Sequence, residues 1–121
     1  MVQIERPGWG ERHAVSEILR VRACALAQAG DFRESDSTFE QALRAAREQN
    51  ARSLELRAAV GYARSLAERR RAAEAISILR PVYDWFTEGH DTKDLREAAA
   101  LLAELSTAGV GTVAMAPDRS R

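Results

Sequence analysis

The residues of this chain that could do chemistry are few and lie far apart. His90 is the best candidate for a metal ligand, because Glu88, Asp91 and Asp94 lie close to it in the sequence. A zinc site needs several imidazole or thiolate ligands that are held rigidly. One histidine among carboxylates at a helix junction is better explained by helix capping, so we predict no metal site.

The other reactive side chains are equally isolated. His13 and Glu17 have the i, i+4 spacing of an ion pair on a helix surface, which is commoner than a catalytic base with its orienting acid. Cys24 has no histidine at helical spacing that would activate it as a nucleophile. As the only cysteine it cannot form an internal disulfide, which suits a reducing cytoplasm. We therefore expect a cytoplasmic protein that is not an enzyme and holds no cofactor.

The charge balance argues against two classes of partner. The 121 residues include 18 Lys and Arg and 18 Asp and Glu, so the formal net charge is zero. A chain without net positive charge has no electrostatic case for nucleic acid or an acidic membrane. The triplet Arg69 to Arg71 is expected to be a solvated turn, and no apolar run approaches the roughly 20 residues of a membrane span.

Helical periodicity organises the chain. Apolar residues recur at i, i+3 and i+4, and Ala, Leu and Arg are strong helix formers, so we predict an all-α domain over residues 11–106. Residues 1–10 are expected to be a flexible N-terminal arm and residues 107–121 a disordered tail. The predicted helices span about 11–29, 32–49, 51–68, 72–88 and 93–106.

Turn residues separate these helices. Gly30 is expected to end the first helix with positive φ, and Asp31 to cap the second together with Glu34. Asn50 is the best substitute for glycine at the next left-handed position. The turn at 69–71 has no glycine, so a tighter or partly helical connection is expected there.

A weak repeat of about forty residues connects the two halves. The identities are Ala23 on Ala63, Leu26 on Leu66, Ala27 on Ala67 and Glu34 on Glu74. Alternating small and large residues let paired helices approach closely, which favours stacked helix pairs. A generic antiparallel bundle has a similar pattern of Ala and Leu and remains the alternative. Trp85, which lies off the main apolar stripe of its helix, is expected to pack in a second buried face.

The segment GDFRESDSTFEQAL resembles a tetratricopeptide repeat, with Gly30 and Asp31 in the turn and Phe32, Phe39 and Ala42 at its aromatic and small positions. The segments GERHAVSEILRVRA, ARSLELRAAVGYARSLAERRRAAEA and LRPVYDWFTEGHDTKDLREAAALLAEL are similar to the C-terminal repeat segment of bacterial signalling proteins. Those proteins join an ATPase to an adenylate-cyclase-type or transcriptional-regulator output domain. The resemblance departs at His13 and Arg70, where that group has tryptophan and glycine.

The resemblance implies a short solenoid of two antiparallel helix pairs plus a C-terminal capping helix, whose first helices line a groove. By that pattern the groove residues are Glu17, Arg20, Cys24, Gln28, Arg57, Val60, Arg64 and Glu68. The arginines among them suit a carboxylate, because the guanidinium binds it with two parallel hydrogen bonds.

Two functions remain open at this point. The first is a non-catalytic, protein-binding scaffold module that docks a peptide or protein in its groove. Its open N-terminal end, with the self-association candidates Val15, Ile18 and Leu19, would also allow a homodimer. The alternative is an effector-sensing repeat segment of a bacterial cyclase-type or transcriptional regulator, which an upstream ATPase or DNA-binding module in the same reading frame would favour.

Overall fold

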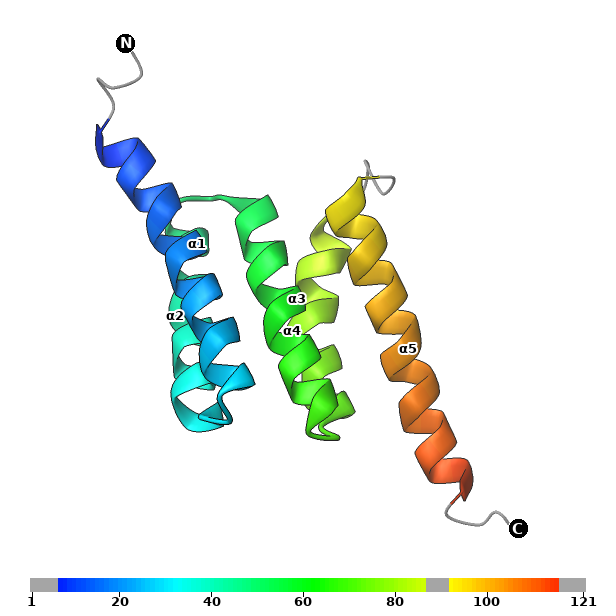
Figure 1. Ribbon diagram of the computed structural model, residues 1–121. Coiled ribbons are helices and arrows are strands. Elements are labelled where there is room, and N and C mark those ends of the chain that lie inside the picture. Colours follow the sequence, from blue (N-terminus) through cyan, green and yellow to red (C-terminus); the bar gives the residue numbers. More distant parts are fainter. Residues whose placement is uncertain (1–6, 87–91, 116–121) are drawn as a thin grey trace.

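The computed structural model describes residues 7–86 and 92–115, and the side chains of residues 15–86 and 92–107. Every regular element in this part of the chain is an α-helix, which confirms the prediction of an all-α fold. The first four helices follow one another through short turns (Figure 1). They are α1 (Pro7–Gln28), α2 (Phe32–Glu48), α3 (Arg52–Glu68), α4 (Ala72–Trp85) and α5 (Lys93–Met115).

The outer helices are longer than the sequence predicted. α1 begins at Pro7, inside the expected flexible arm, because proline suits the first position of a helix, where its missing N–H costs nothing. α5 continues to Met115, so the prediction of a disordered tail is wrong for residues 107–115. Once the packed turns of a helix exist, each further residue adds a hydrogen bond, and the helix propagates into a segment without periodicity. α4 ends at Trp85, earlier than expected.

Three turns repeat one backbone geometry every twenty residues. Gly30, Asn50 and Arg70 have positive φ values of 86, 57 and 63°. In each turn the next N–H donates to a carbonyl five residues back, and the nitrogen–oxygen distance is 2.9 Å each time. This is the Schellman ending of a helix. It confirms the predictions for Gly30 and Asn50, whereas the tighter connection expected at residues 69–71 is wrong.

The third turn has positive φ at an arginine, and the side chains on either side of Arg70 form contacts with neighbouring helices. Arg69 binds the carboxylate of Asp36 on α2 at 2.7 Å, and its guanidinium carbon lies 4.4 Å from the centre of the Phe32 ring. Arg71 donates to Glu74 at 2.7 Å. The arginine triplet is therefore only partly the solvated turn expected from the sequence, because Arg69 is held between two helices.

α3 is the central helix. It packs against each of the other four, and α1 also packs on α2 and α4 on α5. Its buried side chains include Leu56 and Leu66, and fully buried alanines such as Ala59 and Ala63 let neighbouring helices approach closely. Figure 1 shows α3 between α1 on one side and α5 on the other. Residues far apart in the sequence therefore meet across one surface of α3.

Candidate functional site

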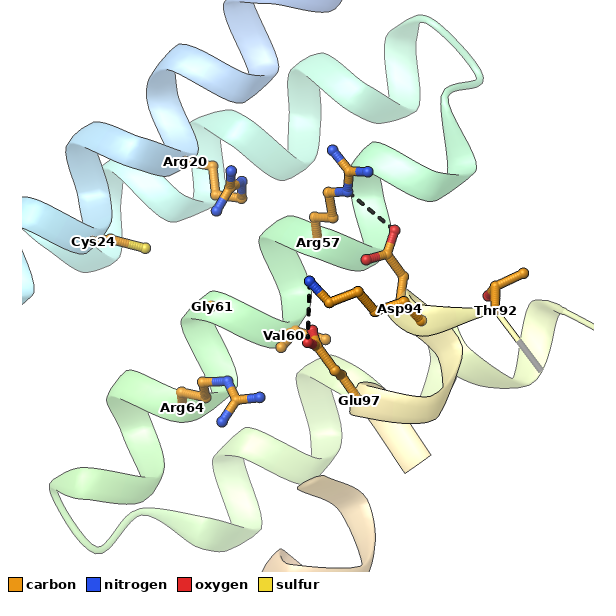
Figure 2. Close-up of a pocket in the computed structure, with 10 residues that line it drawn as sticks. Arg20, Cys24, Arg57, Val60, Gly61, Arg64, Thr92, Asp94 and Glu97 are labelled. Carbon is orange, nitrogen blue, oxygen red and sulfur yellow. Dashed lines mark hydrogen bonds and ion pairs between the residues drawn. The ribbon is translucent and has the colours of Figure 1, made fainter. Parts of the chain in front are cut away.

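A groove of about 490 Å³ lies on the surface where α1, α3 and α5 meet. Figure 2 shows its side chains coming from these three helices. From α1 and α3 the lining residues are Arg20, Cys24, Arg57, Val60, Gly61 and Arg64. From the first turns of α5 they are Lys93, Asp94 and Glu97, and Thr92 just before that helix completes the lining. The groove is mostly charged, with half-buried Cys24 and buried Val60 as its apolar contribution.

An ion-pair network crosses one end of this groove. The Arg57 Nε donates to Asp94 Oδ2 on α5 at 3.1 Å, and its Nη1 lies 3.5 Å from Glu17 Oε1 on α1. Glu17 in turn pairs with Arg20, at 3.1 Å between Nη2 and Oε1. The hydrogen bond with Asp94, followed by the negative charges of Asp94 and Glu17, raises the pKa of Arg57 above its usual value. Arg57 therefore connects all three helices.

Arg64 differs from the other basic residues of the groove. It is exposed, and within the described part of the chain it forms no hydrogen bond or ion pair. Lys93, by contrast, approaches Glu97 along α5, with 3.9 Å between Nζ and Oε2. Arg64 lies one helical turn beyond Val60 and Gly61 on α3, away from the network. It offers its full set of guanidinium donors to a ligand.

The structure brings together most of the predicted groove residues. Those on the groove wall are Arg20, Cys24, Arg57, Val60 and Arg64, and Glu17 binds two of them from its edge. The remaining two candidates, Gln28 and Glu68, are exposed at the ends of α1 and α3 and do not line it.

Sequence reasoning missed the wall contributed by α5. Applying the forty-residue shift a second time, from Glu17 through Arg57 to Glu97, would have indicated that α5 continues the series of groove helices. The resemblance implies only a capping role for this helix. Gly61 was also missed, although a glycine in the middle of a helix often marks a close approach.

Gly61 leaves room for the Phe39 ring behind the groove. A Cβ atom at this position would lie 3.0 Å from Phe39 Cε1, too close for an unrelaxed contact. The Phe39 ring stacks on Tyr62, with centroids 5.2 Å apart. Burial, together with Glu40 and Asp36 nearby, raises the pKa of Tyr62 well above its usual range, so its hydroxyl stays protonated and donates to Glu40 at 3.1 Å.

Trp85 lies on the other side of the molecule and is 53% exposed, so the prediction of a buried Trp85 is wrong. It is the last residue of α4, where no following turn of that helix covers the ring. Arg52 covers one face of the ring instead, at 4.4 Å from the centroid, and also binds buried Glu55 at 3.2 Å. Arg47 completes this cluster at 2.8 Å from Glu55. Glu55 is therefore a structural ion-pair partner.

The N-terminal end of the helix array carries an apolar stripe. Val15, Ile18 and Val21 on α1 are 44, 64 and 56% exposed. Leu19, the third self-association candidate, packs against the core instead. Val21 takes its place in the stripe, and the sequence analysis did not single it out.

Neither a metal site nor a membrane span is found in the part of the chain that the structure describes. No cluster of three or more potential metal ligands occurs there. Glu88, His90 and Asp91 lie outside the described residues, as does the side chain of His13. No helix of this part is long and apolar enough to cross a bilayer. Comparisons with protein families, curated proteins and solved structures find no match for the chain.

Proposed function

We propose that the chain is a short tetratricopeptide-like solenoid, and that it acts as a non-catalytic module which binds a peptide or protein. Two antiparallel pairs, α1 with α2 and α3 with α4, form the repeat, and α5 closes it. The three Schellman turns at residues 30, 50 and 70 support this assignment, because one backbone unit recurs at a constant interval.

The groove supports peptide binding through the way its side chains are arranged. The helices α1, α3 and α5 each contribute side chains to the groove wall. A bound peptide would therefore contact side chains that are spread along an extended surface. At one end of the groove, Arg57 on α3 forms ion pairs with Glu17 on α1 and Asp94 on α5. Extended surfaces of this kind bind peptides by several modest contacts.

Arg64 is the observation that carries the proposal, because it is the groove cation without a partner in the described residues. A carboxylate of the ligand would bind its guanidinium with two parallel hydrogen bonds. Buried Val60, one helical turn earlier on α3, would contact an apolar side chain of the same ligand. The proposed ligand is therefore an acidic peptide segment that contains apolar residues.

Fluorescence anisotropy with labelled peptides tests this proposal. An acidic peptide containing leucines should bind, and its lysine-substituted counterpart should not. Arg64→Glu should weaken binding by about tenfold or more, the value of a charge-assisted hydrogen bond. Arg44→Glu is the matched control, since Arg44 is exposed on α2 and does not line the groove. Equal losses in both variants, or equal binding of both peptides, would contradict the groove assignment.

A further inference from the structure

A heptad spacing on α1 involves Ile18 and Val21 of the apolar stripe and, beyond them, Ala25. Ile18, Val21 and Ala25 are separated by three and then four residues, and all three are exposed. Ser16 and Ala23 on the opposite side of α1 are buried. A pattern of this kind is the seam along which two helices pack together. In the described part of the molecule nothing covers it.

Two opposite charges lie on the two flanks of this seam. Glu17 precedes Ile18 on one flank, and Arg22 follows Val21 on the other. These four residues together line one surface hollow. Arg22 has no ion-pair partner within the described residues. The Glu17 carboxylate keeps acceptor capacity, because its Oε2 receives a hydrogen bond from Arg20 Nε and from no other described group.

We infer that a second copy of this chain binds the seam, with the two α1 helices parallel and a two-fold axis running along them. Rotation about such an axis brings opposite flanks together, so Glu17 of each copy faces Arg22 of the other. In coiled coils, positions g and e pair across the interface in this way, and Glu17 and Arg22 occupy them when Ile18 is at position a. The apolar seam is then removed from water in both copies.

The charges select this orientation over its alternative. In an antiparallel pair the two-fold axis is perpendicular to the helices, and each flank of α1 faces the same flank of α1 in the second copy. Arg22 would then lie on the same side as Arg22 of the second copy, which is unfavourable. The parallel arrangement is also isologous and closed, so it stops at a dimer.

Sedimentation velocity over a range of concentrations tests the dimer. The full chain should show a reversible equilibrium between monomer and dimer. Ile18→Glu should weaken association by at least about tenfold, because each copy loses a buried aliphatic side chain. Ile18 is 64% exposed, so circular dichroism should show an unchanged fold. Ala103→Glu, at an exposed position on α5, should leave association unchanged. A chain that stays monomeric at high concentration, or that forms open-ended polymers, would overturn the inference.

Cysteine cross-linking tests the orientation independently. In a Cys24→Ser background, Ala25→Cys should form an intermolecular disulfide on mild oxidation, because a parallel pair places equal positions at the same height. A disulfide requires Cα atoms about 4.4–6.8 Å apart, which an antiparallel pair centred between Ile18 and Val21 does not provide at position 25. Ala103→Cys is the control for random collision. Equal cross-linking of both variants, or of neither, would overturn the parallel two-fold pair.

Discussion

The two sides of α3 hold the molecule together in different ways. On one side, Phe39 of α2 is fully buried, stacks on Tyr62 and lies against Gly61. On the other side, Arg57 reaches through solvent-exposed ion pairs to Glu17 on α1 and Asp94 on α5. Burial of aromatic area contributes several kcal/mol, whereas a surface ion pair contributes about 0–1 kcal/mol.

This difference between the packed side and the groove side of α3 indicates which residues are available to bind a ligand. The packed side cannot change without loss of stability, because close-packed atoms have no alternative partners. The groove side exchanges one carboxylate for another at little cost, since its ion pairs are partly hydrated already. Gly61 belongs to both sides, because it lines the groove and gives Phe39 its space.

Phe39→Ala should produce the largest effect. Removing a fully buried ring leaves a cavity and unstacks Tyr62, which should lower the free energy of unfolding by about 3–5 kcal/mol. Urea denaturation followed by circular dichroism measures the change. Arg57→Ala, taken from the groove side of the same helix, is the comparison and should cost about 1 kcal/mol or less. Equal losses would remove the distinction between the two sides.

Gly61→Val should have an intermediate effect. The added side chain meets Phe39 at a distance where its ring must shift, so the variant should lose about 1–3 kcal/mol of stability. Combining it with Phe39→Leu should recover part of that loss, because the smaller side chain leaves room. The denaturation midpoints of the four proteins in this cycle give the coupling. Strict additivity of the two changes would show that Phe39 does not limit position 61.

Asp94→Asn should have the smallest effect on stability, within about 1 kcal/mol, and the cost should fall as salt is added. The same change frees the Nε of Arg57 from its carboxylate partner, so the acidic peptide should bind more tightly. Asp84→Asn, which alters another exposed ion pair, with Arg80, is the matched control and should leave peptide binding unchanged. Peptide binding that weakens equally in both variants would show that Arg57 does not take part.

The sequence predicted the local features of the fold most reliably. Helix periodicity located five helices, and Gly30, Asp31 and Asn50 marked turns through backbone preferences that act within a few residues. The N-cap is observed, since Asp31 accepts the Glu34 N–H at 3.4 Å. The third turn escaped prediction, because Arg70 adopts φ 63° without being a residue that prefers it. In that turn the side chain of Arg69 contacts Asp36 and Phe32 on α2. These contacts between helices accompany a backbone conformation that the preference of arginine alone does not favour.

The candidate groove was predictable to the extent that it follows the repeat. Arg20, Arg57 and Arg64 were found from their register on α1 and α3. The α5 wall was not predicted: a second forty-residue shift leads from Arg57 to Glu97, but that α5 packs beside α3 becomes apparent only in the tertiary structure. For the same reason the exposure of Trp85 was missed: whether a ring at a helix end is covered depends on where the neighbouring helices stop.

By itself, the order of residues determined that this chain is helical, where most of its helices turn, and which side of α1 and α3 carries charge. These properties depend on neighbours within one or two turns. Only the tertiary structure decided that Arg57 is held by carboxylates from two other helices while Arg64 has no partner among the described residues. The energy of an ion pair depends on the distance between groups, and residues 17, 57 and 94 approach one another only when the helices pack.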